Sequence, residues 1–474
     1  MKLYFWILTI LITALSCEHD NKEGYAYIGG EVVSPKNNIV FITHADKIID
    51  TVRLDKNNRF IYKFDNLKPG LYSFSLQSSE GLEYQTVLLE PNDSILFRLN
   101  TLDFDESLVY TGIGAKKNNY FIDEFLKNEN EVKKIFKLCQ LTPEAYEKHV
   151  DSIKYNKDKN LEDFKDKNKT SELFNSIARA NIDFNYYYNK EIYPFVHYGD
   201  KAEILKDLPK NFYAFRQQIN YSDDNLKDNY IYKSFLKYSL SNLALSSHFE
   251  HSQGDNFNWM SSCYNLDRLN LIDSLVTNNT LKNELLFKFT MNFLTRNNSE
   301  TTNKKIIASY LSKSSSNENN EEIKLFANSL SKLKKGTSIP NVKVINLYNS
   351  NENAINSLIN SPTVIFFWSH KFYNHFKESH NKINELKLKY PEVKFISINI
   401  DNYDTQKWKT IIETNKILNK DEYKFQNPSE STKALAIWHM TKTILVDKDQ
   451  KIVNSNTNIF ERNFEEQLLG LINK

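Results

Sequence analysis

Histidines are the residues best equipped for chemistry in the last third of this 474-residue chain. Four of the ten histidines lie there, and His370, His375 and His380 fall in or just after FFWSHKFYNHF, residues 366–376. Neutral imidazole binds Zn²⁺ and Cu²⁺. His375 and His380 are five residues apart, about 140° around a helix, so they cannot share one face as an i, i+4 pair does. The spacing therefore favours hydrogen-bonded or solvated imidazoles over an enforced metal site, with His380 as a core or groove residue.

Thiols are scarce in this sequence. Its three cysteines are Cys17, Cys139 and Cys263, and their spacing matches no redox or zinc motif. Cys139 and Cys263 could pair in an oxidising compartment or remain two structural thiols, and the second interpretation is favoured. Both are expected on helices, and neither has a basic neighbour pattern that would lower the pKa of its thiol.

The N-terminal residues MKLYFWILTILITALSC are typical of an export signal. Lys2 precedes an apolar run from Leu3 to Leu15, which is shorter than the roughly 20 residues that span a bilayer. The run ends in Ala14-Leu15-Ser16-Cys17, which resembles a bacterial lipobox with Ala in place of the commoner Leu. This resemblance implies that residues 1–17 are a lipoprotein signal peptide, cleaved before a lipid-bearing Cys17. The alternative is an ordinary secretory signal with an incidental cysteine.

The expected partners follow from this leader and from the charge. A lipid on Cys17 would tether the protein to the outer membrane, on its periplasmic face or at the cell surface. The 61 basic and 59 acidic residues nearly cancel, which argues against nucleic acid as a partner. No motif for a cofactor is present, so none is expected.

Composition and patterning predict a folded, multidomain chain. The sequence has 27 Tyr, 31 Phe and only 11 Gly, enough large side chains for sizeable cores, and its length suggests two or three domains. Residues 24–105 contain short alternating runs separated by turn residues such as SPKNN and LKPG, and they predict a β-sandwich. Residues 106–335 are predicted to be mainly helical.

Local signals support the helical assignment. Thr142, Pro143 and Glu144 form a helix start, with an N-cap, a first-turn proline and an acid. NNSETTN (297–303) and SKSSSNENNEE (312–322) are expected to be polar loops between later helices. The triplet Tyr186-Tyr187-Tyr188 is interpreted as a core-facing aromatic stripe rather than a ligand cage.

Residues 336–474 alternate strand and helix patterns and predict an α/β fold. The expected strands and helices are VKVINL, TVIFFW, NHFKESHNKINELKLKY, VKFISINID, DTQKWKTIIETN, TKTILVD and NFEEQLLGLI. This order resembles the TlpA/ResA-type thioredoxin domain of exported bacterial disulfide reductases. The resemblance rests on the G-x-x-x-P entry at Gly336–Pro340, the strand Val364–Trp368, the third strand at Val393–Asp401, and the strand Thr441–Asp447.

The resemblance extends loosely over most of the mature chain. EPNDSILFRL (90–99), LVYTGIGAKKNNYF (108–121) and LPKNFYAFRQQINYS (208–222) resemble segments of Bacteroidota lipoproteins with a C-terminal thioredoxin-like domain. The implied fold is therefore an N-terminal β-sandwich, a helical middle segment and a C-terminal thioredoxin-like domain.

At the implied redox site, the residues that carry the family's chemistry are replaced. Counting on from Phe367-Trp368, the resemblance places the nucleophilic cysteine at Phe372, the resolving cysteine at His375, a helix proline at His380 and the cis-proline at Thr441. Glu378 keeps a glutamate that the family often has. Disulfide exchange needs a thiolate and a second sulfur, which Phe and His cannot supply.

The resemblance thus implies a redox-inactive site with a groove beside the start of the helix. The leading interpretation is a binding or scaffolding protein of the cell envelope that holds a peptide or an envelope protein in this groove. One alternative is a thiol–disulfide oxidoreductase that works through Cys139 or Cys263. The other is a metal-handling protein, because in this fold His439 would lie near His370 and His375.

Overall fold

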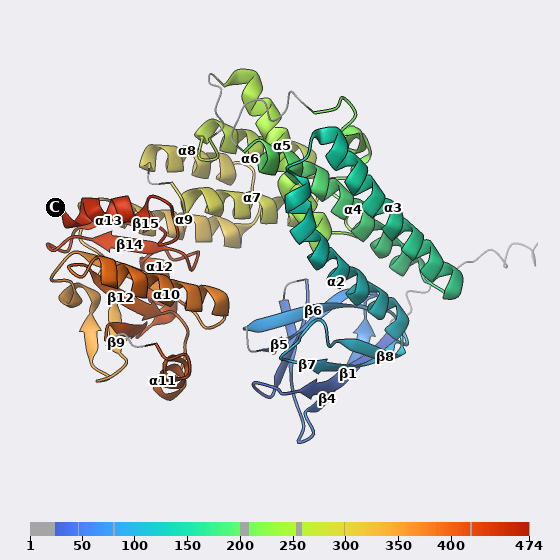
Figure 1. The fold of residues 1–474 in the computed structure, drawn as a ribbon, viewed down its shortest axis with the longest axis horizontal. Helices are drawn as coiled ribbons and strands as arrows, with labels where there is room; N and C mark the ends of the chain where they lie inside the picture. Colours follow the sequence, from blue (N-terminus) through green and yellow to red (C-terminus); the bar gives the residue numbers. More distant parts are fainter. Residues whose placement is uncertain are drawn as a thin grey trace, which may run out of the picture. The chain divides into compact units, whose positions relative to one another are not determined.

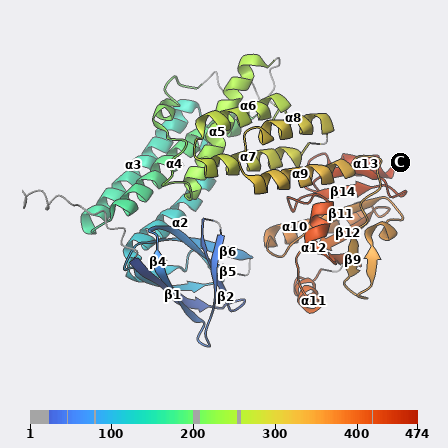
Figure 2. The same ribbon diagram turned by 180° about the vertical axis from the view of Figure 1, so that it is seen from behind.

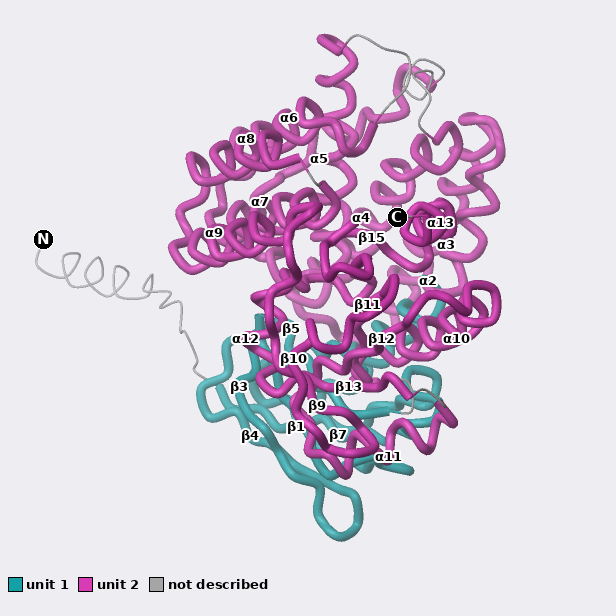
Figure 3. The backbone as a smooth tube through the Cα atoms, turned by 90° about the vertical axis from the view of Figure 1, so that its left-hand side faces the viewer, with its two compact units in different colours: residues 1–79, 83–128 teal, residues 80–82, 129–474 magenta. Residues whose placement is uncertain are grey.

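The computed structural model describes residues 24–45, 47–78, 81–199, 208–252, 258–297, 299–417 and 420–473. The predicted signal peptide and Cys17 lie outside these residues. Within the described part of the chain, no helix is both long enough and apolar enough to cross a membrane. The chain divides into two compact units, residues 1–79 with 83–128 and residues 80–82 with 129–474, coloured separately in Figure 3.

The first unit contains two antiparallel-rich sheets, as the alternating pattern predicts. Its strands are β1 (Gly24–Val33), β2 (Ile39–His44), β3 (Lys47–Arg53), β4 (Arg59–Leu67), β5 (Gly70–Gln77), β6 (Leu82–Leu89), β7 (Ser94–Asn100) and β8 (Val109–Ile113). The strand orders are β4-β1-β7-β8 and β3-β2-β5-β6; Figure 2 shows these strands in blue. Phe74 and Phe97, one from each sheet, stack with their ring centroids 4.4 Å apart. Strand β8 follows residue 105, where the sandwich was expected to end.

The middle of the chain is helical, as predicted. Its helices are α2 (Ala115–Leu138), α3 (Pro143–Lys167), α4 (Glu172–His197), the 3₁₀ helix η3 (Ala214–Gln218), α5 (Tyr230–His251), α6 (Ser262–Leu275), α7 (Asn279–Leu294), α8 (Glu300–Leu311) and α9 (Asn317–Lys332). Thr142 caps α3, because its side chain accepts a hydrogen bond from the Ala145 backbone N–H. This helix start is confirmed.

Two expected loops were wrong in part. NNSETTN and SKSSSNENNEE contain the first turns of α8 and α9. Ser299 accepts a hydrogen bond from the Thr302 N–H, and Ser316 accepts one from the Asn319 N–H. Serine is as typical of a helix N-cap as of a loop, so polarity alone could not separate the two.

The tyrosine triplet of α4 packs into the helical core, as expected. Tyr187 stacks on Phe215 with ring centroids 4.4 Å apart, and Tyr188 meets Tyr238 edge-on at 5.2 Å. Tyr186 donates a hydrogen bond to Asp151. Packing and hydrogen bonding thus engage all three rings.

The C-terminal part contains one seven-stranded mixed sheet (Figure 1). Its elements are β9 (Lys343–Asn346), β10 (Glu352–Ala354), the 3₁₀ helix η4 (Ile355–Leu358), β11 (Thr363–Trp368), α10 (Tyr373–Lys389), β12 (Lys394–Asn399), α11 (Thr405–Thr414), β13 (Glu422–Phe425), α12 (Pro428–Ala434), β14 (Thr443–Val446), β15 (Ile452–Thr457) and α13 (Phe464–Ile472). The order is β10-β9-β13-β12-β11-β14-β15. Strands β11 and β12 are parallel, whereas β14 and β15 are antiparallel.

This topology is the thioredoxin-like fold that the sequence predicts, with short additions that the sequence did not reveal. Strands β10 and β13 and helix α12 are three to seven residues long, too short for a clear periodic pattern. Helices α10, α11 and α13 pack on one face of the sheet, and α9 and α12 pack on the other. Phe326 and Leu330 of α9 contribute to both the helical core and the sheet core, which joins these parts into one unit.

Candidate functional site

The loop between β11 and α10, at the carboxyl end of the central strand, is held by one buried carboxylate. Asp401 follows β12 and is 7% exposed. It accepts hydrogen bonds from the Ser369 hydroxyl at 2.7 Å and from the His370 backbone N–H at 2.8 Å. Ser369 Oγ in turn accepts the Lys371 N–H at 3.1 Å. A loop with this many internal bonds presents a fixed backbone at the start of α10.

Phe372 occupies the N-cap position of α10 and points toward solvent. Its side chain makes no capping hydrogen bond and is 57% exposed. Phenylalanine is a poor N-cap, because it has no oxygen to accept from the first N–H groups of the helix. The residue therefore does not stabilise the helix end, and its ring is an exposed apolar surface.

Three aromatic side chains of this region, Phe372, His375 and Phe460, are named here the aromatic patch. Phe372 precedes the first residue of α10, and His375 lies in the first turn of that helix. The rings of His375 and Phe460 lie 6.0 Å apart, and Phe460 is 41% exposed. Burial, with a smaller contribution from His380, lowers the pKa of His375 to about 4. The imidazole is therefore neutral at physiological pH.

The backbone of Phe372 is paired with the backbone of a glycine that lies far away in the sequence. Gly81, which belongs to the second unit, forms an isolated antiparallel bridge with Phe372. A Cβ atom on Gly81 would lie 2.7 Å from the Lys371 carbonyl oxygen. The close approach therefore needs a residue without a side chain.

The other predicted site residues have separate surroundings. His380 is buried, and its ring nitrogens lie 2.7 Å from the Phe376 carbonyl oxygen and 3.2 Å from Glu422 Oε1. This agrees with the expected core position. Glu378 and Thr441 are exposed, and the described residues contain no cis peptide bond.

His370, His375 and His439 have different neighbours. His370 packs on Tyr373, with ring centroids 5.6 Å apart, whereas His375 packs on Phe460. Burial lowers the pKa of His370 and of His439, and the charge of Arg296 lowers that of His439 further. These three imidazoles do not belong to the group of potential metal ligands that the described residues do contain.

Thr441 is followed by a buried lysine, Lys442, whose burial the sequence does not indicate. Lys442 donates from Nζ to the Ala436 carbonyl oxygen at 3.0 Å and is 7% exposed. Burial lowers the pKa of its ammonium group to about 7. In the stretch TKTILVD this residue reads as an ordinary polar position at a strand start, so sequence reasoning missed it.

The two described thiols differ from the sequence interpretation in one respect. Cys139 is fully buried, and burial raises the pKa of its thiol to about 11. Cys263 has a basic neighbour after all, because His251 Nδ1 lies 3.4 Å from its sulfur. Burial and the charge of Asp267 nevertheless raise the pKa of Cys263. Both thiols are free, so the described structure contains no Cys139–Cys263 disulfide.

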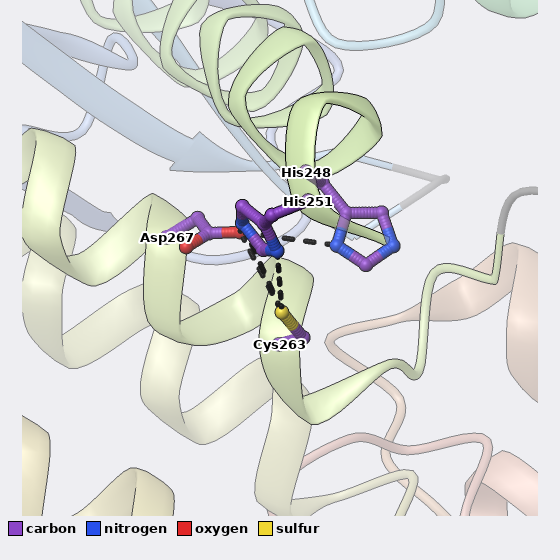
Figure 4. Close-up of side chains that lie close together, drawn as sticks. All are labelled: His248, His251, Cys263 and Asp267. Atoms are coloured by element: carbon purple, nitrogen blue, oxygen red, sulfur yellow. Dashed lines mark hydrogen bonds and ion pairs between the residues drawn. The ribbon is translucent and has the colours of Figure 1, made fainter. Parts of the chain in front are cut away.

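Cys263 belongs to a four-residue group that the sequence analysis missed, the cluster His248, His251, Cys263 and Asp267 (Figure 4). His248 and His251 lie three residues apart on α5, and Cys263 and Asp267 lie four apart on α6. These spacings place each pair on one face of its helix. The signal that could have revealed the cluster was therefore H-x-x-H followed by C-x-x-x-D on two successive predicted helices.

Solved structures that are similar to this chain match about 30% of it. No protein-family model matches the chain, and no curated protein matches it. The thioredoxin domain of a thiol-disulfide oxidoreductase from Bacteroides vulgatus is 18% identical, with a TM-score of 0.24, over 29% of this chain and 99% of that one. A thiol:disulfide interchange protein from a Bacteroides species is 18% identical, with a TM-score of 0.24, over 30% and 93% of the two chains. At these values the similarity is no evidence of activity.

Proposed function

We propose that this protein is a non-enzymatic binding protein of the cell envelope that holds an extended peptide segment of another protein at the start of α10. The observation that carries the proposal is Phe372, an exposed aromatic side chain where the resembled family has its nucleophilic thiol. An apolar ring at a helix N-cap does nothing for the helix itself. Its exposure therefore favours a role in contact with a partner.

The surroundings of Phe372 suit an extended, partly apolar segment. The aromatic patch supplies apolar contact area, and burial of such rings is a main source of binding energy. The Phe372 backbone is already paired with Gly81, so an incoming segment would contact the exposed Phe372 ring rather than this backbone. The Asp401 network holds the loop in place, which lowers the ordering cost of binding.

Thiol–disulfide exchange, the alternative, lacks support at this surface. Neither Phe372 nor His375 carries sulfur, and a thiolate is the required nucleophile. Cys139 is fully buried with a raised pKa, and Cys263 lies on α6. In an insulin-reduction assay with dithiothreitol, the mature protein should match the buffer control. A faster rate that Cys263→Ser abolishes would favour the oxidoreductase interpretation.

The binding role is tested with an unfolded probe that presents many extended segments. Fluorescently labelled, reduced and carboxymethylated α-lactalbumin is titrated with the purified mature protein, and anisotropy is recorded. Phe372→Ala should weaken binding by about tenfold or more, since a central aromatic anchor typically contributes over 1.4 kcal/mol. The matched control is Leu388→Ala, at an 88% exposed apolar position on the same helix. Equal binding by both variants would contradict the proposal.

The envelope location rests on the N-terminal sequence, and we propose lipidation of Cys17. The apolar run is too short to span a bilayer and ends in small residues before the cysteine. Cys17→Ala should abolish labelling by a radioactive fatty acid and release the protein from membranes. Persistent labelling together with membrane association would contradict it.

A further inference from the structure

The cluster His248, His251, Cys263 and Asp267 brings four potential metal-ligating side chains from two helices to one point. Their donor atoms lie within 4.8 Å of one another. The close-up in Figure 4 shows the four side chains converging, two from α5 and two from α6. Because each pair has i, i+3 or i, i+4 spacing, the two helices themselves fix which side chains face each other. The histidines near α10 have no such enforced arrangement.

Four of the six distances between the donor atoms lie between 2.9 and 4.0 Å, and all six lie within 4.8 Å. His251 Nε2 lies 2.9 Å from Asp267 Oδ2 and 3.9 Å from Cys263 Sγ. Asp267 Oδ2 lies 4.0 Å from Cys263 Sγ and 3.8 Å from His248 Nδ1. A tetrahedral Zn²⁺ site with bonds of about 2.0–2.3 Å has edges of roughly 3.3–3.8 Å. Side-chain movements of up to about 1 Å would therefore bring the four donor atoms to this geometry.

The charges of the cluster also fit a divalent cation. One carboxylate and one thiolate would balance the two positive charges of the ion, and two neutral imidazoles would complete the shell. His251 is the last residue of α5, and the negative end of the helix dipole favours a cation there. His248 is buried and His251 is about half exposed, so one side of the cluster is accessible to an incoming ion.

We propose that His248, His251, Cys263 and Asp267 bind one Zn²⁺ ion in tetrahedral geometry. Mixed nitrogen, sulfur and carboxylate ligands suit Zn²⁺ better than the harder Mg²⁺ and Ca²⁺, which take oxygen ligands. With all four positions filled by side chains, the ion would join α5 to α6 as a structural ligand. The inference is independent of the peptide-binding proposal, because the two sites share no residue.

The test uses the full mature chain, stripped of metal with a chelator and titrated with Co²⁺ and then Zn²⁺. One equivalent of Co²⁺ should produce the intense visible bands of tetrahedral cobalt and a thiolate-to-cobalt charge-transfer band, and Zn²⁺ should displace both. Cys263→Ser should abolish the charge-transfer band. Asp267→Asn, which keeps the side-chain shape, should weaken Zn²⁺ binding by about tenfold or more, the equivalent of 1.4 kcal/mol.

Two matched variants control for the residue types. Cys139→Ala removes the other described thiol, and His149→Ala removes an exposed histidine of α3. Both should leave the cobalt spectrum and the zinc affinity unchanged. The proposal is overturned if the charge-transfer band survives in Cys263→Ser. It is also overturned if Zn²⁺ fails to protect Cys263 from iodoacetamide, because a thiol that stays reactive in excess zinc is a free nucleophile and not a ligand.

Discussion

The start of α10 and the cluster on α5 and α6 both contain histidines, but the two regions arrange them differently. Near α10, histidines stand at positions 370 and 375, yet they pack on different aromatic rings, Tyr373 and Phe460. On α5 and α6, His251 lies within 4.0 Å of both a thiol and a carboxylate. Proximity in the sequence therefore did not produce a cluster, whereas helical spacing on two neighbouring helices did.

The two regions differ in how visible they are in the sequence. Motifs drew attention to the strand–helix junction at Phe372, because its sequence context resembles a redox site. The helical middle has no motif of that kind, and its cysteine appeared unremarkable. What matters physically is whether backbone geometry forces donor atoms together, and i, i+3 and i, i+4 pairs do so without any family motif.

The largest effect is expected at the start of α10, where a single substitution should lower the free energy of unfolding. Asp401→Ala leaves the Ser369 hydroxyl and the His370 N–H without their acceptor, and unsatisfied buried donors to a charged partner cost about 3 kcal/mol in total. Urea unfolding followed by tryptophan fluorescence measures this loss. Asp404→Asn is the control, because Asp404 is an exposed N-cap of α11 and Asn caps equally well.

The same variant tests whether the two regions are independent. Asp401→Ala should keep wild-type zinc affinity, since Asp401 touches none of the four cluster residues. A stability within about 0.5 kcal/mol of wild type would show that the Asp401 bonds do not fix the loop, since that is the usual range for surface changes.

The next largest effect is stabilisation by metal. A ligand that binds only the folded state stabilises it by about 2.7 kcal/mol at a free concentration of 100 times its Kd. Thermal unfolding with and without excess Zn²⁺ should show a rise in melting temperature for wild type and for Phe372→Ala. Asp267→Asn should show a much smaller rise. A similar rise in all three proteins would point to zinc bound elsewhere.

Much of the fold could be predicted from the sequence, because it depends on local signals. These are the alternation of apolar residues in the strands, the Thr142 helix cap and the apolar run Val364–Trp368. The site follows less well. The exposure of Phe372 and the burial of Lys442 depend on neighbours far along the chain. A phenylalanine is usually buried and a lysine usually exposed, so the residue types alone do not predict either position. Short elements such as β13, whose four residues are set by pairing with β12 and β9, likewise have no period of their own.

A pH-dependent effect on stability is expected from the buried Lys442. The pKa of Lys442 is lowered from 10.5 to about 7 by burial, so between these values the unfolded chain holds more protons than the folded one. The contribution of Lys442 to the free energy of unfolding therefore rises with pH, by about 2 kcal/mol between pH 7 and pH 9. Below pH 7 both states are protonated and the penalty is constant.

Lys442→Met should remove this rise. The measurement is the difference in unfolding free energy between variant and wild type at several pH values, which cancels the groups common to both. The variant should gain most at pH 7 and progressively less toward pH 9. A difference that does not change with pH would mean that Lys442 is solvated and keeps an ordinary pKa. Lys433→Met, at an exposed position on α12, is the control.

The smallest expected effect is a gain of redox activity at the start of α10. Phe372→Cys with His375→Cys restores two sulfurs at the spacing of the resembled family, and the positive end of the α10 dipole would favour a thiolate there. Little insulin reduction above the dithiothreitol control is nevertheless expected. Thr441 still stands where the family has a proline, and exchange requires a substrate disulfide to lie against the new thiolate. The two single cysteine variants are the controls. Robust turnover in the double variant alone would mean that only the sulfurs separate this surface from a working reductase, which would also weaken the proposal of a binding site.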